Sequence, residues 1–220
     1  MAGSGRNWTK DAKETRERLL NAAEELFAQK GLDGISIREL ITKANCNLSA
    51  VNYYFGDKKE LYEELFRQRL REMRDTRLSA IQNAMKARAR PTLEKLLHTY
   101  AVAFLEPFAD FERSQRFLHL FSRELVEQRL PRDFFVEEMA GPVMAALENA
   151  IITLCPDLDK RNAQMSVHSV VAQLVHIIHL RIILGVEQSH LATNSDIERA
   201  IDHIVKFSAA GIRACEKGKE

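Results

Sequence analysis

The stretch 47–55 carries amide, hydroxyl and phenol side chains, which can form hydrogen bonds with the edges of DNA bases. Read as a helix, it places Val51 and Phe55 four residues apart, so that both face inward. The side chains left facing outward are those of Leu48, Ser49, Asn52 and Tyr53. Because amides pair with base edges and small side chains allow a close approach, such a helix suits a DNA major groove. Asn52 has no obvious structural task, and we predict that it is the main base-reading residue.

Two helices that precede this stretch are predicted from apolar spacing and end signals. From Thr15 onward, apolar residues recur at steps of three and four, and the helix should end at Gly31 in a left-handed conformation. Ser36 and Glu39 have the spacing of a capping box, which predicts a short second helix that ends near Lys43.

Similar signals bound the third and fourth helices. Residues 44–46 form a tight connection, and the Asn47 side chain can cap the third helix. After Gly56, Asp57 can cap a fourth helix with Glu60 in the capping-box position. One longer and two short helices, the last two joined by a tight turn, form a unit that presents its third helix outward.

The segment from Leu19 to Leu61 resembles the N-terminal domain of the tetracycline-repressor (TetR) family of bacterial regulators. The matching runs are LLNAAEELF at 19–27, KGLDG at 30–34, SIREL at 36–40 and, most diagnostic, VNYYFGDKKEL at 51–61. The resemblance implies an N-terminal helix-turn-helix domain and a C-terminal helical domain that binds a ligand and forms a homodimer. It also implies that the dimer binds double-stranded DNA at a pseudo-palindromic operator, with repression as the family's default.

The resemblance assigns expected DNA contacts to individual positions. Ser36 and Arg38 fall where the family's second helix meets the backbone or a base edge, although capping alone also explains Ser36. Tyr53 and Lys58 match phosphate-contacting positions, although Lys58 could be an ordinary solvated charge. The recognition-helix positions are occupied by Leu48, Ser49, Ala50 and Asn52.

Two of these positions depart from the family pattern. The family usually has Tyr where Asn52 stands and a polar residue where Leu48 stands, so the operator sequence cannot be predicted. Leu48 or Ala50 could touch thymine methyl groups, and Asn52 could pair with adenine. Cys46 occupies a position that favours a buried role over redox sensing.

Net charge does not by itself indicate a nucleic-acid partner. The 220 residues contain 32 basic and 31 acidic side chains, a net charge of +1, so attraction to DNA must come from local placement. Lys10, Lys13 and Arg16 are expected to add nonspecific attraction. Three cysteines without paired spacing read as free thiols, and we see neither a signal peptide nor a membrane span, which favours a cytoplasmic protein.

The whole chain is predicted to be all-α. We expect a flexible arm over 1–12, the helix-turn-helix DNA-binding domain over 13–60 and a helical ligand-sensing and dimerisation domain over 61–220. The later helices are expected at 91–108, 113–128, 131–154 with a kink at Gly141-Pro142, 158–186 and 195–215.

An apolar cavity between helices of the C-terminal domain is expected to hold a small, largely apolar effector. The residues predicted to line this pocket are Tyr100, Phe104, Phe108, Phe117, Phe121, Met139 and His176. His168, His176 and His179 share one helix face without a neighbouring Cys or carboxylate, so polar roles are favoured over a metal site. We predict no metal and no cofactor.

The helices around 166–184 and 197–212 match by position the pair that forms the family's dimer interface. Their apolar side chains exceed what one helix face can hide: Val170, Leu174, Ile177, Ile178, Ile182, Ile201, Ile204, Val205 and Phe207.

Two alternatives to a regulator remain open. An enzyme is disfavoured because the sequence has no glycine-rich phosphate loop, no H-E-x-x-H and no G-x-S-x-G. A di-iron helical enzyme would need two E-x-x-H motifs, and only Glu187–His190 fits. A helical module that binds a partner but has lost DNA binding is the stronger alternative, because residues 1–60 are also near neutral.

Overall fold

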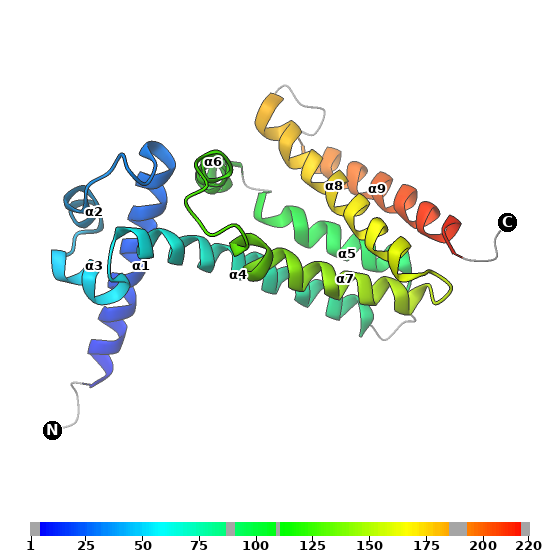
Figure 1. The fold of residues 1–220 in the computed structure, drawn as a ribbon, viewed down its shortest axis with the longest axis horizontal. Coiled ribbons are helices and arrows are strands. Elements are labelled where there is room, and N and C mark those ends of the chain that lie inside the picture. The colour runs from blue at the N-terminus through cyan, green and yellow to red at the C-terminus, as the bar shows by residue number, and fades with distance from the viewer. Residues whose placement is uncertain (1–4, 87–90, 109–110, 185–192, 217–220) are drawn as a thin grey trace. The chain divides into compact units, whose positions relative to one another are not determined.

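The structure is a computed structural model that describes residues 5–86, 91–108, 111–184 and 193–216. Every regular element in these ranges is helical, which confirms the all-α prediction (Figure 1). The chain divides into unit 1, Met1–Leu70 with Glu112–Phe134, and unit 2, Arg71–Phe111 with Phe135–Glu220. Among the described residues, no helix is both long and apolar enough to cross a lipid bilayer.

Unit 1 is built on three N-terminal helices that pack on one another. They are α1 (Gly5–Lys30), α2 (Ile37–Ala44) and α3 (Leu48–Phe55), followed by the first part of α4 (Lys58–Met85) and by α6 (Phe111–Glu127). Residues 5–12, which the sequence analysis assigns to a flexible arm, are helical and belong to α1. The segment between residue 5 and the apolar part of α1 contains few helix-breaking residues, so the helix can extend through it toward the N-terminus.

The predicted capping signals of α1 and α2 are confirmed. Gly31 ends α1 with φ of +73°, a left-handed conformation that favours glycine. At the start of α2, the Glu39 amide donates to the Ser36 hydroxyl at 3.2 Å, and the Ser36 amide donates to the Glu39 carboxylate at 2.8 Å.

The caps of α3 and α4 are confirmed as well. Asn47 accepts a hydrogen bond from the Ala50 amide at 3.0 Å, and Asp57 accepts one from the Glu60 amide at 2.8 Å. Between these helices, Gly56 has φ of +77°, a backbone conformation in which any residue with a Cβ is strained. A glycine is therefore required where α3 turns into α4.

A buried carboxylate joins α4 to α6 inside unit 1. Glu124 is 2% exposed, accepts the Tyr62 hydroxyl at 2.8 Å and accepts the Leu130 amide at 2.7 Å. Phe66 and Phe117 add a ring contact with centroids 5.9 Å apart. The contacts from Tyr62 to Glu124 and from Phe66 to Phe117 each join residues more than fifty positions apart, and unit 1 includes both segments, whereas the sequence prediction has a single boundary at residue 60.

Unit 2 contains the remainder of α4 and the later helices. These are α5 (Leu93–Leu105), the 3₁₀ turn η1 (Glu106–Phe108), the π-helix η2 (Val136–Ala140), α7 (Gly141–Leu154), α8 (Lys160–Leu184) and α9 (Asn194–Ala214). The kinked helix predicted over 131–154 begins after a turn, at residue 134, and runs without a break to Leu154. Its irregularity is the π-helix η2, which ends directly before the expected kink at Gly141-Pro142. Pro142 lies in the first turn of α7, directly after η2, so the change from π-helix to α-helix falls at the Gly141-Pro142 pair.

The core of unit 2 is formed by α5, α7, α8 and α9, which lie against one another (Figure 1). The apolar residues of α8 and α9 that we took as an excess are buried in this core: Val170, Leu174, Ile177, Ile178, Ile201, Ile204 and Val205. That argument for dimerisation is therefore wrong for these residues, because the packing of α5, α7, α8 and α9 within one chain already buries them. The Ile182 side chain lies outside the described residues, and Phe207 is 66% exposed.

The Glu124 hydrogen bonds generate a prediction about stability. Tyr62→Phe removes the hydroxyl donor and should lower the free energy of unfolding by about 2 kcal/mol, because a buried carboxylate loses a partner. Urea unfolding followed by circular dichroism measures the change. The matched control is Tyr53→Phe, since Tyr53 is 80% exposed and its loss of a hydroxyl should leave stability unchanged. Equal effects of the two substitutions would contradict a structural role for the Glu124 contacts.

Candidate nucleic-acid interface

Helix α3 has one buried and one exposed side, as its sequence predicts. Val51 and Phe55 are buried, whereas Leu48 is 53% exposed and Tyr53 is 80% exposed. Asn52 is exposed, and its side-chain amide forms no hydrogen bond with any residue that the structure describes. The amide therefore keeps its donors and acceptor for a partner such as a base edge.

Two other α3 positions are less available than Asn52. The Ser49 hydroxyl donates to the Asn47 side chain at 2.7 Å, and Ala50 is half-buried. Both nevertheless lie in the first turn of α3, at the end that follows the tight turn from α2. That turn is fixed by Asn45, which has φ of +49°, and by the Cys46 amide, which donates to the Ile41 carbonyl at 3.0 Å.

The two positions singled out on α2 differ in their bonding. The Ser36 hydroxyl is engaged in the capping box and also donates to the Glu39 carboxylate at 3.0 Å. Capping thus gives Ser36 a structural role. Arg38 is exposed, and within the described part of the chain its guanidinium has no ion-pair partner. It is thus available for a bidentate contact with phosphate or guanine.

The two positions predicted to contact phosphate also differ. The Lys58 ammonium donates to the Ile35 carbonyl at 2.9 Å and is half-buried, so it ties the start of α4 to the loop before α2. Tyr53 stands clear of the core, and its ring meets that of Tyr54 edge-to-face with centroids 4.9 Å apart. The Tyr54 ring therefore helps to hold the Tyr53 ring in place, while the Tyr53 side chain remains exposed to solvent.

One arginine of α1 was predicted to attract DNA, and another was missed. Arg16 pairs with Glu64 and lies over the Phe55 ring, 5.4 Å from its centroid, so its charge serves unit 1 internally. Arg18 is exposed and lines a hollow together with residues of α3 and of the turn before it, including Asn47, Ser49 and Tyr53. Only the packing of α1 on α3 brings Arg18 there, and no sequence spacing indicates it. Lys13 is exposed, and the Lys10 side chain lies outside the described residues.

Cys46 is half-buried beside this hollow. Burial raises the pKa of its thiol, and the nearby positive charge of Arg18 lowers it by less. Because the thiolate is the reactive form, the structure favours a packing role.

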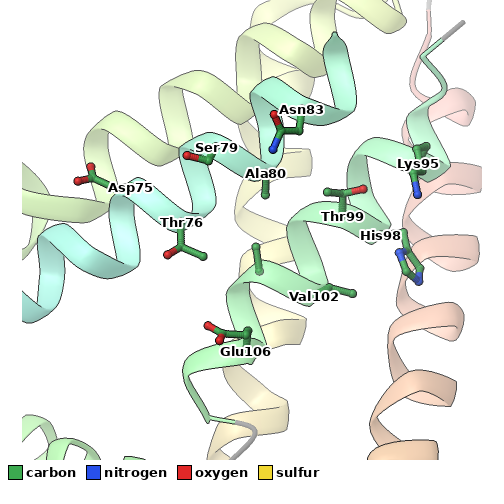
Figure 2. Close-up of a pocket in the computed structure, with 11 residues that line it drawn as sticks. Asp75, Thr76, Ser79, Ala80, Asn83, Lys95, His98, Thr99, Val102 and Glu106 are labelled. Atoms are coloured by element: carbon green, nitrogen blue, oxygen red, sulfur yellow. The ribbon is translucent and has the colours of Figure 1, made fainter. Parts of the chain in front are cut away.

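A second concave feature lies in unit 2, as an open groove between α4 and α5. Figure 2 shows side chains of both helices around it. Its lining combines polar residues, among them Asp75, Ser79 and His98, with an apolar surface to which Val102 and Ala103 contribute. None of the seven residues predicted to line an effector pocket belongs to this groove.

The predicted pocket residues are distributed over both units. Tyr100, Phe104 and Phe108 are buried in unit 2, and Met139 is half-buried in η2. Phe117 and Phe121 belong to α6 in unit 1, where their rings contact each other with centroids 6.1 Å apart. His176 is exposed on α8, as are His168 and His179. Within the described residues, no group of three or more potential metal-binding side chains is found.

Comparisons with known proteins agree with this geometry. The family model "Bacterial regulatory proteins, tetR family" matches residues 19–65, and "Tetracyclin repressor-like, C-terminal domain" matches residues 102–211. The HTH-type transcriptional regulator AcrR of Shigella flexneri is 25% identical over 77% of this chain and 71% of its own length. The HTH-type transcriptional repressor BepR of Brucella suis is 27% identical over 61% of this chain and 63% of its own length.

Solved structures share the fold at low sequence identity. The TetR family transcriptional regulator PfmR of Thermus thermophilus is 15% identical and superposes with a TM-score of 0.61, over 88% of this chain and 95% of that one. The family models and the curated relatives identify a helix-turn-helix transcriptional regulator, a class of DNA-binding protein, and the exposed side of α3 is consistent with that class. This chain belongs to the TetR family.

The capping box that begins α2 predicts a pH-dependent contribution to stability. Hydrogen bonds from Lys30 and Ser36 hold the pKa of Glu39 at about 2, below its ordinary value of 4.5. A depressed pKa in the folded protein stabilises it above about pH 4.5, and this stabilisation is lost as the pH falls toward 2. The advantage of the native protein over Glu39→Gln in urea unfolding should therefore shrink as the pH falls from about 6 to about 3.5.

Lys30→Met provides the matching control. It removes the strongest contact of the Glu39 carboxylate, at 2.8 Å, and should weaken the pH dependence without abolishing it, because the Ser36 contacts remain. An advantage over Glu39→Gln that stays constant across this pH range would contradict the assignment.

Proposed function

We propose that this regulator is a homodimeric repressor that binds a pseudo-palindromic operator and is released from it by a small molecule. The observation that carries the proposal is the exposed, unbonded side chain of Asn52 on a helix whose opposite side is buried. Such a helix inserts into a major groove with its polar side toward the bases. The proposed site of action is the cytoplasm, where such an operator would be reached.

Each candidate residue takes a role that its surroundings support. Asn52 reads a base edge, and Arg38 contacts guanine or phosphate. Leu48 and Ala50 approach thymine methyl groups, and the exposed Tyr53 hydroxyl contacts a phosphate. The hydroxyls of Ser36 and Ser49 would have to leave Glu39 and Asn47 to donate to phosphates. Lys58 contributes its charge at the start of α4, where the helix dipole also favours an anion. Arg18 adds to the positive potential around α3.

The proposed dimer interface is the exposed side of α8 and α9. Phe207 on α9 is 66% exposed and Met165 on α8 is 60% exposed, so each helix offers a large apolar side chain to a second copy of the chain. Gly211, on α9, has no atom within 4 Å of the place where a Cβ would be, which leaves room for a close helix approach. Two-fold pairing of these helices would present two α3 helices to successive major grooves.

We propose that an effector bound in unit 2 favours a conformation in which the two α3 helices are wrongly spaced for DNA. Helix α4 contributes residues to both units and provides the covalent route for this linkage. Solution scattering of the dimer with and without an inducing ligand tests it, and identical spacing in both states would contradict it.

A gel-shift assay tests the DNA-binding part of the proposal. The probe is DNA from immediately upstream of the protein's own gene, used at two salt concentrations. Asn52→Ala should weaken binding by about 5- to 150-fold, the effect of about 1–3 kcal/mol at a base contact. Arg38→Ala should weaken binding and, if it removes a phosphate contact, lower the salt dependence by about one ion.

Asn149→Ala, at an exposed position of α7 in unit 2, is the matched control and should bind like the native protein. Full affinity of a folded protein carrying both Asn52→Ala and Tyr53→Ala would contradict the interface. Absence of binding at either salt concentration would favour the alternative, a partner-binding module that has lost DNA binding.

The dimer interface has a separate test by light scattering coupled to gel filtration. Phe207→Asp places a charge on the proposed interface and should convert a dimer into a monomer at micromolar concentration. Val102→Asp is the control, because Val102 is also an exposed apolar residue of unit 2, at 44%, but belongs to α5. A native protein that is monomeric, or a Phe207→Asp variant that stays dimeric, would contradict the assignment.

A further inference from the structure

Arg77 carries a positive charge into the interior of unit 2. It belongs to α4, and only 3% of its surface is exposed. A charge so far from water is normally matched by a carboxylate and by hydrogen bonds that use its remaining donors. Arg77 has only part of this compensation.

The contacts of Arg77 are made by weak acceptors. One terminal nitrogen donates to the Met139 sulfur at 2.9 Å, and the other donates to the Phe104 carbonyl at 3.4 Å. The guanidinium lies over the Phe104 ring, 4.0 Å from its centroid. Its Nε is buried and has no hydrogen-bond partner. A thioether is a poor acceptor for a guanidinium, so these contacts leave the charge undercompensated.

Two neighbouring arginines of the same helix are satisfied by oxygen. Arg71 donates to the Glu138 carboxylate at 2.9 Å, and Arg74 donates to the Glu138 carbonyl at 3.4 Å and to the Asp75 carboxylate at 2.9 Å. The three arginines follow one another at steps of three residues and reach the same π-helix η2. Where Arg71 and Arg74 meet oxygen atoms of η2, Arg77, the most deeply buried of the three, meets the Met139 sulfur.

No carboxylate compensates Arg77 among the residues that the structure describes. Burial lowers the pKa of its guanidinium to about 10, and the only nearby titrating group with an effect on it is the Tyr100 phenol. Burial in turn raises the pKa of Tyr100 to about 12, so this phenol is neutral near pH 7. Arg77 is therefore charged at that pH and lacks an anion.

We propose that Arg77 is the anchor of a binding site for the carboxylate of an amphipathic small molecule, whose apolar body would lie against Phe104 and Met139. The inference rests on the proposed function in that this molecule would be the effector of unit 2. The guanidinium fork matches a carboxylate in two parallel hydrogen bonds, and Nε is one of the donors left for it. A single cation among apolar residues balances one negative charge, which favours a monocarboxylate over a doubly charged phosphate.

The place of Met139 supplies the route by which such a group reaches Arg77. Met139 is half-buried, and its sulfur contacts the Arg77 guanidinium, so this side chain joins the buried charge to a residue that is partly exposed to solvent. It is unbranched and belongs to the π-helix η2, a helix type that is rare and frequent at functional sites. Rotation of one flexible side chain therefore exchanges the sulfur for a ligand oxygen.

Thermal unfolding with a panel of monocarboxylates tests the proposal. The probes are hexanoate, decanoate, benzoate and phenylacetate, each compared with the alcohol of the same skeleton. At saturating concentration, at least one carboxylate should raise the Tm of the native protein by about 5 °C, and its alcohol should not. Arg77→Met should abolish this shift. In the ligand-free protein the same substitution should not lower the Tm, because an apolar side chain of similar length replaces an undercompensated charge.

Two further variants keep the outcome decisive. Met139→Glu supplies an internal carboxylate, and it should raise the Tm of the ligand-free protein and remove the response to the probes. Arg74→Met, on the same helix but outside the proposed site, should keep the response. A panel without effect on the native protein, or a response that survives Arg77→Met, would overturn the proposal. These measurements contain no DNA, so their failure is distinct from a failure of operator binding in the gel-shift assay.

Discussion

The burial of Val51 and Phe55 on one side of α3 is the constraint on which the DNA-binding surface depends. Once these two side chains are inside, the direction of every other residue of the helix is set by the helical period. Asn52 and Tyr53 must then face outward, whatever their own preferences. The core beneath α3 therefore determines which residues can meet a base pair.

Much of unit 1 could be predicted from sequence because its signals are local. The caps at Ser36, Asn47 and Asp57 each join residues three positions apart, and the structure contains all three. Gly31 and Gly56 mark turns through their own backbone conformation. Interactions of this kind need no knowledge of the rest of the fold.

The predictions that failed or fell short concern contacts between distant segments. The apolar residues of α8 and α9 looked excessive because their burial depends on packing with α5 and α7, which lie elsewhere in the chain. The sequence predicts that Arg16 attracts DNA, but in the fold its guanidinium pairs with Glu64 and lies over the Phe55 ring. The sequence does not single out Arg18 or Arg77. The hollow beside Arg18 and the lack of a carboxylate near Arg77 both depend on segments that are distant in the sequence, so the spacing of residues cannot indicate them.

The contact between Glu124 and Tyr62 has a consequence for how the chain is made. Unit 1 takes α6 and the segment up to Phe134 from beyond the first helices of unit 2. On the ribosome, the N-terminal helices must wait for these residues to emerge before their last buried hydrogen bonds can form. For the same reason, a fragment cut after Leu70 would expose Tyr62 and Phe66 to solvent. A DNA-binding module for fusion proteins would have to retain α6.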